Sequence, residues 1–581
     1  MKNIMYRKTF PIFAFLLAFL SCTNLEEDIL DESLTGTGQA ETVSGSIAPV
    51  YGLLRNVWLH TRNFGLQEIA SDEAILPYRG GRDWFDGGKF IAVHQHLTTP
   101  GNALVGDTWT DLTLTLSRAV AAEERLKPEA ESGDAEAQGA LYEMIAMKAY
   151  LNMQLLDNWG LLFKKSSGAA RSEILRGQAA IDYLESDLLS VVNVINTNKG
   201  PGRFSRNAVK ALLARLYLNA AVYRNPYGTP DFKAEDMQKV IQYTNEIISG
   251  PYSLSPEYFA LFNDNNNTNP EIIFSLDQRG VLQTEHSRWA YWSISGDLVP
   301  RPEWPNTRGT DAAALTPDFY QTWVNAYGNV DPAEADARFF QENTIVPENL
   351  EDLTGITPAN DSEHYYCVDA NSFEINRGIL RGTIWGPRKD AAGNILKCAD
   401  GKVRIYPVIN ARTSGANRTY VDHIMQVDFT DQGSLHHTGH RFSKYQFSRT
   451  APDCCNYSSV DLVLIRLGEI YLMRAEAKLR SGDNAGALAD INTLRTSRNA
   501  RPAQTPAALT SLSLDILFRE SGFELYWEGL RRNYQIRFGK YEGSWTGKTG
   551  NDVNKRLFPI PQKAIDGASN LPGFLSQNPG Y

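Results

Sequence analysis

Three glutamates, Glu520, Glu524 and Glu528, recur at four-residue intervals and would share one face of a helix. Pairs of carboxylates in a cleft are the groups that hydrolyse glycosidic bonds, so a glycoside hydrolase is one interpretation. Acids gathered on one helix face more often need basic partners. The candidate partners are Arg466, Arg474, Arg531 and Arg532. We therefore expect a structural ion-pair network here and no catalytic residue.

The segment "SLHHTGH" supplies His436, His437 and His440. Two histidines three residues apart on a helix can bind zinc. No glutamate of the H-E-x-x-H kind accompanies them, and Gly439 disfavours a helix. We expect a surface loop without a metal ligand. Because the chain also shows no nucleophile motif and no phosphate-binding glycine loop, we expect neither an enzyme nor a cofactor.

Aromatic residues gather in two segments that glycine and proline keep from being helical. "RWAYWSISGDLVPRPEW" spans residues 288–304, and "PYRGGRDWFDGGKF" spans residues 77–90. Rings in such loops can stack on flat ligands such as sugars, although packing in the core would also explain them. We predict a ligand-binding surface from these two loops. Its residues are Arg82, Asp83, Trp84, Trp289, Tyr291, Trp292 and Trp304. Trp323, by contrast, is expected in the core.

The N-terminus has the pattern of an export signal. Lys2, Arg7 and Lys8 precede an apolar run over residues 10–20 that is too short to span a bilayer. The sequence Phe-Leu-Ser-Cys at residues 19–22 is typical of a bacterial lipoprotein cleavage site. We expect a signal peptide over residues 1–21, a lipid on Cys22, and a flexible acidic tether over residues 22–40. The lipid would be the only membrane attachment.

The composition is that of a globular protein. Of 581 residues, 42% are hydrophobic and 21% are charged, and the formal net charge of −10 argues against a nucleic-acid partner. Cys367, Cys398, Cys454 and Cys455 remain beyond Cys22. In an oxidising compartment they could form one or two disulfides, but their spacing does not say which.

Helical periodicity dominates the rest of the chain. Residues 139–160 carry one apolar stripe, residues 205–228 and 237–248 form a helix-turn-helix unit, and residues 461–498 repeat that design. Residues 260–460 differ, because short strands such as "EIIFSL" and "GKVRIYPVINAR" alternate with turns. We predict a mainly α fold: a tetratricopeptide-like scaffold of helical pairs with a loop-rich region that carries short strands and binds the ligand, all in one domain over residues 41–581.

The last helical pair resembles a known family. "LIRLGEIYLMRAEAKLRSGDNAGALADINTLRTSR", "FRESGFELYWEGLRRNYQIRFG", "LFPIPQKAI" and "LSQNPGY" follow one another in the order typical of the SusD/RagB family of surface lipoproteins in Bacteroidetes. Upstream, "LQEIASDEAILPYRGGRDWFDGGKF" and "SRNAVKALLARLYLN" are also similar to that family. The resemblance covers nearly the whole chain beyond the predicted signal peptide.

This resemblance implies a lipid-anchored protein on the outer face of the outer membrane. Such a protein captures an oligo- or polysaccharide, performs no catalysis, and delivers the ligand to a SusC-like TonB-dependent transporter. Because RagB-like members serve peptide uptake, a peptide ligand is the alternative. The family's early and mid-chain binding loops correspond to the segments that contain Trp84 and Trp289 to Trp304.

Overall fold

The computed structural model describes residues 42–79, 86–165, 171–197, 200–278, 288–427, 437–449 and 458–581. Residues Val43–Tyr581 form one compact unit. The predicted signal peptide, Cys22 and the predicted tether lie outside the described residues and stay predictions. Within the described ranges, no helix combines the length and the apolar character that a membrane crossing needs.

Helices make up most of the secondary structure, which confirms the mainly α prediction. They are α2 (Val43–Val57), α3 (Asn63–Ile69), α4 (Lys89–His94), α5 (Ala103–Glu131), α6 (Ala135–Trp159), α7 (Gly177–Val191), α8 (Arg206–Tyr223), α9 (Ala234–Ile248), α10 (Pro317–Tyr327), α11 (Pro332–Ala335), α12 (Glu348–Glu351), α13 (Leu467–Arg480), α14 (Asn484–Thr496), α15 (Leu514–Leu525), α16 (Arg531–Arg537) and α17 (Gln562–Gly567).

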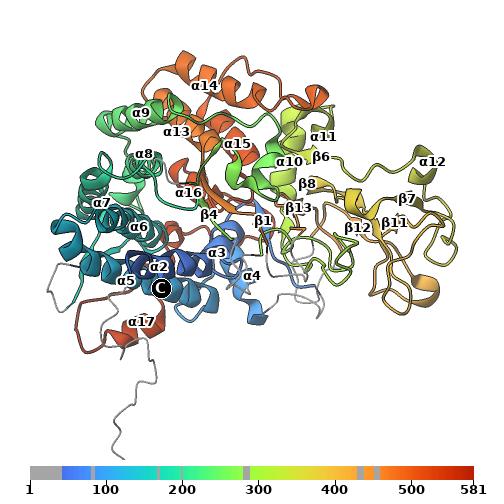
Figure 1. Ribbon diagram of the computed structural model, residues 1–581, viewed down its shortest axis with the longest axis horizontal. Helices are drawn as coiled ribbons and strands as arrows, with labels where there is room; N and C mark the ends of the chain where they lie inside the picture. Colours follow the sequence, from blue (N-terminus) through green and yellow to red (C-terminus); the bar gives the residue numbers. More distant parts are fainter. Residues whose placement is uncertain are drawn as a thin grey trace, which may run out of the picture. The chain divides into compact units, whose positions relative to one another are not determined.

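The long helices form a continuous row in which each packs on the next. α5 contacts α6, and the row continues through α7, α8 and α9 to α13 and α14 (Figure 1). Each of these helices has an apolar face too small to be stable alone, so stacking neighbours buries one continuous core. The predicted tetratricopeptide-like scaffold is confirmed.

Side-chain caps fix where the helices begin. Asp134 accepts hydrogen bonds from the backbone N–H groups of the first turn of α6, and Ser205 and Asp483 do the same for α8 and α14. Such caps satisfy donors that the helix itself leaves open. α6 ends at Gly160, which has φ 65°, a conformation that glycine adopts at low cost. The helix boundaries predicted near residues 205 and 483 therefore have a local cause.

Short strands complete the fold. They are β1 (Ala74–Ile75), β2 (Leu162–Lys164), β3 (Glu173–Leu175), β4 (Ile272–Leu276), β5 (Ala314–Leu315), β6 (Phe340–Gln341), β7 (Tyr366–Val368), β8 (Arg377–Leu380), β9 (Gly382–Thr383), β10 (Trp385–Pro387), β11 (Val403–Pro407), β12 (Asp422–His423), β13 (Arg441–Ser443) and β14 (Leu462–Arg466). The pairings are β1–β5, β2–β3, β4–β14, β12–β9, β10–β11–β7 and β13–β8–β6, all antiparallel.

One prediction about the last helical pair was wrong. The apolar run at residues 462–466 is strand β14, and the helix begins only at Leu467. All five strand residues are buried between the helical row and β4. A short apolar run buried on both faces cannot be told from a helix by periodicity alone, and the partner strand decides its conformation.

The loop-rich region has a small core of its own. Tyr291, Ile294 and Leu298 pack with Ile405 of β11 and Val421 in this core, which is separate from the large core of the helical row. The strands of this region, including β7, β11 and β12, lie together on one side of the helices (Figure 1). The segment at residues 288–298 therefore joins two cores.

Candidate functional site

Trp289 and Trp292 are fully buried, with exposed fractions of 0%. The Trp289 ring stacks on Phe64, with centroids 3.8 Å apart, and its indole N–H donates to the carbonyl of Trp58 at 2.8 Å. Trp292 lies against Trp527 with centroids 5.8 Å apart. The prediction that these two rings form an exposed ligand platform was wrong, because the helical core surrounds them.

Tyr291 is also buried, with an exposed fraction of 4%, and it packs in the second core near Phe447. Its assignment as a ligand-binding residue was likewise wrong. The three neighbouring rings point alternately into the two cores, so they anchor the segment from both sides. Their function is to hold the following residues, from Ser295 onward, in a fixed position.

Trp304 differs from the other rings of its segment because it is only partly buried. Its indole N–H donates to the carbonyl of Arg449 at 2.7 Å. Trp323, in contrast, is fully buried in α10 and stacks on Phe523 at 3.6 Å, as expected for a core residue. Among the rings of residues 288–304, Trp304 thus stays a candidate for ligand contact.

Arg82, Asp83 and Trp84 lie outside the described residues, but both ends of their loop are described. On the N-terminal side the buried Arg79 donates to the carbonyls of Ala312 at 3.1 Å and Thr438 at 2.8 Å. On the C-terminal side a 3-10 turn at Asp86–Gly88 leads into α4. The N-terminal side of the early loop is therefore held by residues 312 and 438, and the shared surface with residues 288–304 stays a prediction.

Two open pockets border that mid-chain segment. The first, which we call the basic pocket, has a cavity volume of about 460 Å³. Its lining comprises Gly296, Asp297, Leu298, Val299, Pro305, Thr307, Arg308, Pro358, Gly386, Pro387, Arg388, Lys389, Pro407, Val408, Ile409, Ala411 and Arg418. The volume is within the range of small-molecule binding sites. Aliphatic and proline side chains form its walls, and most of its charged groups are cations.

The second pocket, which we call the Trp385 pocket, has a cavity volume of about 400 Å³. Its lining comprises Leu298, Phe340, Glu342, Thr344, Val346, Glu351, Leu353, Ile375, Asn376, Leu380, Arg381, Thr383, Ile384 and Trp385. Trp385 is partly exposed and lies 6.0 Å from Tyr366, centroid to centroid. Leu298 lines both pockets, so the two pockets meet at the anchored segment.

The three glutamates of α15 and its C-terminal side are buried in an ion-pair network. Glu524 contacts Arg466 at 2.7 Å and Arg498 at 2.5 Å, and Glu528 contacts Lys444 at 2.6 Å. Glu520 contacts Arg495 at 2.5 Å. Because all three carboxylates are saturated with cations and none lines either open pocket, the structural role that we expected is confirmed.

Only one of the four predicted basic partners belongs to this network. Arg466 contacts Glu271, Glu524 and Glu528. Arg474 pairs instead with Asp490, Arg531 pairs with Asp72, and Arg532 donates to backbone carbonyls. Their assignment was wrong because sequence proximity does not reveal which helix face each residue occupies. The partners that were missed include Arg338, Lys444, Arg495 and Arg498.

The histidines do not converge on a common point in the described part of the chain. His437 lies within hydrogen-bonding distance of Asn410, 2.9 Å from Nδ1 to Nδ2, and the buried His440 packs edge-on against Tyr320. His436 lies outside the described residues. One group of possible metal ligands was found there, Cys367, Cys398 and Asp400, but its two cysteines form a disulfide. Cys454 and Cys455 are not among the described residues.

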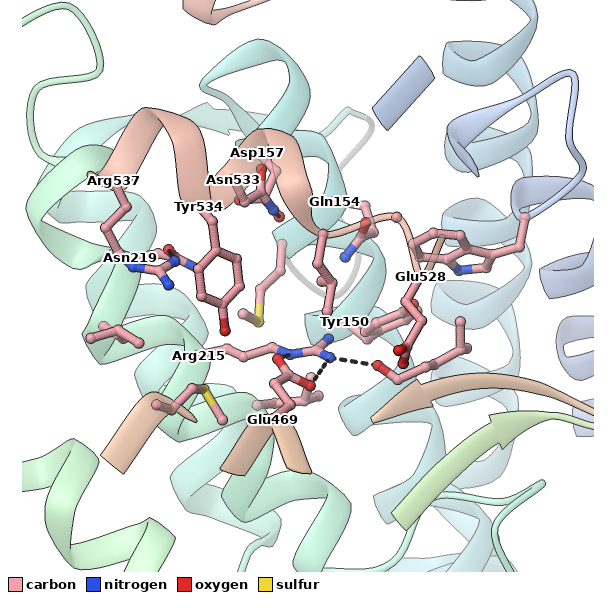
Figure 2. A pocket seen from close by; sticks show the side chains of 18 residues that line it. Tyr150, Gln154, Asp157, Arg215, Asn219, Glu469, Glu528, Asn533, Tyr534 and Arg537 are labelled. Carbon is pink, nitrogen blue, oxygen red and sulfur yellow. Dashed lines mark hydrogen bonds and ion pairs between the residues drawn. The ribbon is translucent and has the colours of Figure 1, made fainter. Parts of the chain in front are cut away.

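A smaller cavity lies inside the helical row (Figure 2). Arg215 of α8 reaches into it and binds Glu469 of α13, with both contacts at 2.6 Å, and the carbonyl of Leu464. The cavity volume is about 30 Å³, which is room for water and not for a sugar. This cavity is therefore part of the packing between helices.

Sequence reasoning missed the charged lining of the basic pocket. Asp297 and Arg308 come from one segment of the chain and Lys389 and Arg418 from a later one, and no spacing rule connects the two segments. The one local signal was the mid-chain segment itself. It was identified for its rings, whereas its contribution to the pockets comes from the residues that follow them.

Comparison with known proteins gives consistent matches. A model described as the SusD family matches residues 437–581. The starch-binding protein SusD of Bacteroides thetaiotaomicron is 27% identical over 424 residues, which is 70% of this chain and 66% of its own length, just under two thirds.

Solved structures share the fold over almost the whole chain. A laminarin-binding SusD-like protein has a TM-score of 0.61 at 18% identity, over 93% of this chain and 99% of its own. The surface glycan-binding protein A from Bacteroides thetaiotaomicron, in complex with laminarihexaose, also has a TM-score of 0.61 at 18% identity, with 92% and 98% covered. The sequence matches make the chain similar to the SusD family, and these structures show that it shares the fold of SusD-like proteins.

Proposed function

We propose that this protein is a cell-surface lipoprotein that captures an oligo- or polysaccharide and delivers it to a SusC-like TonB-dependent transporter. Similarity to the SusD family supports this proposal, as do the names of similar proteins that bind starch or laminarin. The structural observation that carries it is the pair of open pockets that meet at Leu298.

The pockets are suited to ligand capture because their shared wall is preformed. Leu298 follows a segment whose rings are buried in two cores, so little ordering is left to occur when a ligand binds. Preorganisation of this kind improves affinity by lowering the entropy cost of binding. Weak binding at a tethered protein is sufficient, since the tether raises the local ligand concentration at the transporter.

Binding without catalysis is the role that Glu520, Glu524 and Glu528 favour. A glycosidase needs two carboxyl groups on either side of the scissile bond, about 5–10 Å apart. Glu520, Glu524 and Glu528 are held by cations in the interior, away from both pockets. Arg82, Asp83, Trp84 and Trp304 remain proposed ligand contacts.

The test is a glycan array on the chain without residues 1–22, which keeps the compact unit at residues 43–581 whole. Calorimetry with the best glycan then compares Trp385→Ala with Tyr142→Ala, a partly buried aromatic residue on α6. Loss of one stacking ring costs about 0.5–1.5 kcal/mol, or roughly 2- to 13-fold in affinity. A protein that binds no glycan on the array, but binds peptides, would instead support the RagB-like alternative.

The transporter is tested separately. Extraction of the membrane in mild detergent, followed by a pull-down on this chain, should recover a SusC-like protein with it. Recovery of this chain alone in several detergents would contradict the proposed partnership while leaving glycan binding intact.

A further inference from the structure

The charges around the basic pocket are unbalanced. Four cations line it, Arg308, Arg388, Lys389 and Arg418, against one carboxylate, Asp297. The whole chain has a formal net charge of −10, so the positive charge of this pocket is opposite in sign to the charge of the chain as a whole. A binding site that concentrates one sign of charge attracts ligands of the other sign.

One of the four cations is neutralised within the protein. Arg388 binds Asp361 through two parallel contacts, Nη1 to Oδ1 at 2.9 Å and Nη2 to Oδ2 at 2.7 Å. Tyr420 donates to the same carboxylate at 2.9 Å, and the guanidinium of Arg388 lies 3.9 Å from the ring centroid of Tyr406. Arg388 is therefore part of the wall, and its charge is not available to a ligand.

The other three cations have no such partner. Within the described residues, no ion pair joins Arg308, Lys389 or Arg418 to a carboxylate. Arg308 and Arg418 are exposed, and Lys389 is partly buried. Burial and the neighbouring charge of Arg308 lower the pKa of Lys389 below its ordinary value. Like charges held this close repel each other, and an anion placed between them would relieve that repulsion.

The walls of the pocket fit a sugar but do not supply a stacking surface. Leu298, Val299, Pro305 and Pro387 offer aliphatic faces, and the described lining contains no aromatic side chain. Without a ring to stack on, charge is the strongest source of specificity in this pocket. We propose that the basic pocket binds the carboxylate or sulfate group of an acidic oligosaccharide.

This inference rests on the proposed glycan-binding function and specifies the class of glycan. Arginine suits the task because its planar guanidinium donates two parallel hydrogen bonds to carboxylate or sulfate oxygens. The Trp385 pocket has the opposite balance. It presents Glu342 and Glu351, while its one arginine, Arg381, already contacts Asp331 at 3.0 Å. We therefore expect an anionic group to bind in the basic pocket and not in the Trp385 pocket.

The experiment measures binding of four probes to the chain without residues 1–22 by calorimetry at low salt. The probes are tetragalacturonate, a sulfated carrageenan tetrasaccharide, the neutral maltotetraose, and a tetraglutamate peptide. We expect at least one acidic tetrasaccharide to bind tenfold or more tightly than maltotetraose, and to lose most of that advantage at 0.5 M salt, where charges are screened within about 4 Å. The two acidic sugars distinguish a uronate from a sulfate ester.

Two triple variants localise the effect. Arg308→Gln, Lys389→Gln and Arg418→Gln together should abolish the preference for the acidic sugar. Lys127→Gln, Lys233→Gln and Lys563→Gln make the same change of net charge at exposed positions on α5, before α9 and on α17, and should retain it. Circular dichroism confirms that both variants are folded.

The possible results separate this inference from the proposed function. Equal binding of acidic and neutral sugars, or equal losses in both triple variants, would overturn the inference and leave glycan binding standing. Binding of tetraglutamate alone would overturn both in favour of a peptide ligand. If no glycan binds here or on the array, the proposed function itself fails.

Discussion

Trp289 stacks on Phe64 of α3 with ring centroids 3.8 Å apart and ring planes at 18°. This contact fixes the mid-chain segment to the helical row. The buried rings of this segment are thus a structural anchor. The pocket surface that they support consists mainly of charged and aliphatic residues.

Replacing Trp289 with alanine should destabilise the protein by about 3–5 kcal/mol, because a large buried ring would leave a cavity. Urea unfolding followed by fluorescence measures this. Trp304→Ala is the control, since that ring is partly exposed and its loss should cost far less. Equal stability of the two variants would contradict the anchor role of Trp289.

Glu524→Gln should cost about 3–5 kcal/mol as well, because it leaves buried arginines without their counter-charge. Burial opposes ionisation of Glu524, but Arg498, Arg466 and Arg338 outweigh it and lower its pKa well below 4.5. The stabilisation is therefore present above pH 4.5 and is lost as the pH falls toward the folded-state pKa. Glu129→Gln, in the partly exposed pair with Arg125, should cost under about 1 kcal/mol.

Glu68 should make stability depend on pH in the direction opposite to that of Glu524. Burial raises its pKa to about 7, above the ordinary 4.5, although its carboxylate accepts the backbone N–H of Gly529. The folded state then holds a proton that the unfolded state releases, so stability falls as the pH rises from 4.5 to 7, by on the order of 3 kcal/mol. Melting curves of Glu68→Gln across this range should be flatter than those of the wild type. Parallel curves would contradict the assignment.

The disulfide between Cys367 and Cys398 closes a loop with a sequence separation of 31 residues. Chain-entropy arguments give such a bond about 3–4 kcal/mol. Because it ties β7 to the hairpin before β11, Cys367→Ser with Cys398→Ser should loosen the strand-rich region first, which hydrogen exchange would detect. Uniform loss of protection across the helical row would contradict this local effect.

Cys22→Ala should leave the protein folded but without its lipid and absent from the outer membrane. Metabolic labelling with a fatty-acid analogue measures this. Equal labelling of wild type and variant would refute the predicted lipoprotein signal. Cys454→Ala serves as the control, because no cleavage signal precedes that cysteine.

The helical row was predictable because its signals are local. Ser205 and Asp483 cap helices, Gly160 ends one, and apolar stripes identify the buried faces. The strand at residues 462–466 was missed because its conformation depends on β4, nearly two hundred residues away.

The candidate site was less predictable for the same reason. The sequence around a tryptophan in a loop rich in proline and glycine does not indicate whether its ring faces solvent or the core. Trp289 and Trp292 are buried because they pack on Phe64 of α3 and on the turn at Trp527. The cations of the basic pocket meet only after β10 and β11 pair. Periodicity along a chain cannot encode such long-range contacts.

Leu276, the last residue of β4, pairs directly with Leu462, the first residue of β14. The intervening chain therefore starts and ends at neighbouring positions of one small sheet. Insertions with adjacent ends can change in length and content without displacing their host. The region that carries both pockets is thus joined to the scaffold at one place in the chain, and Trp289, Arg338 and Lys444 are among the buried residues that must keep matching the scaffold. New ligand specificities can then evolve through changes in the residues that line the pockets, while these buried contacts stay constant.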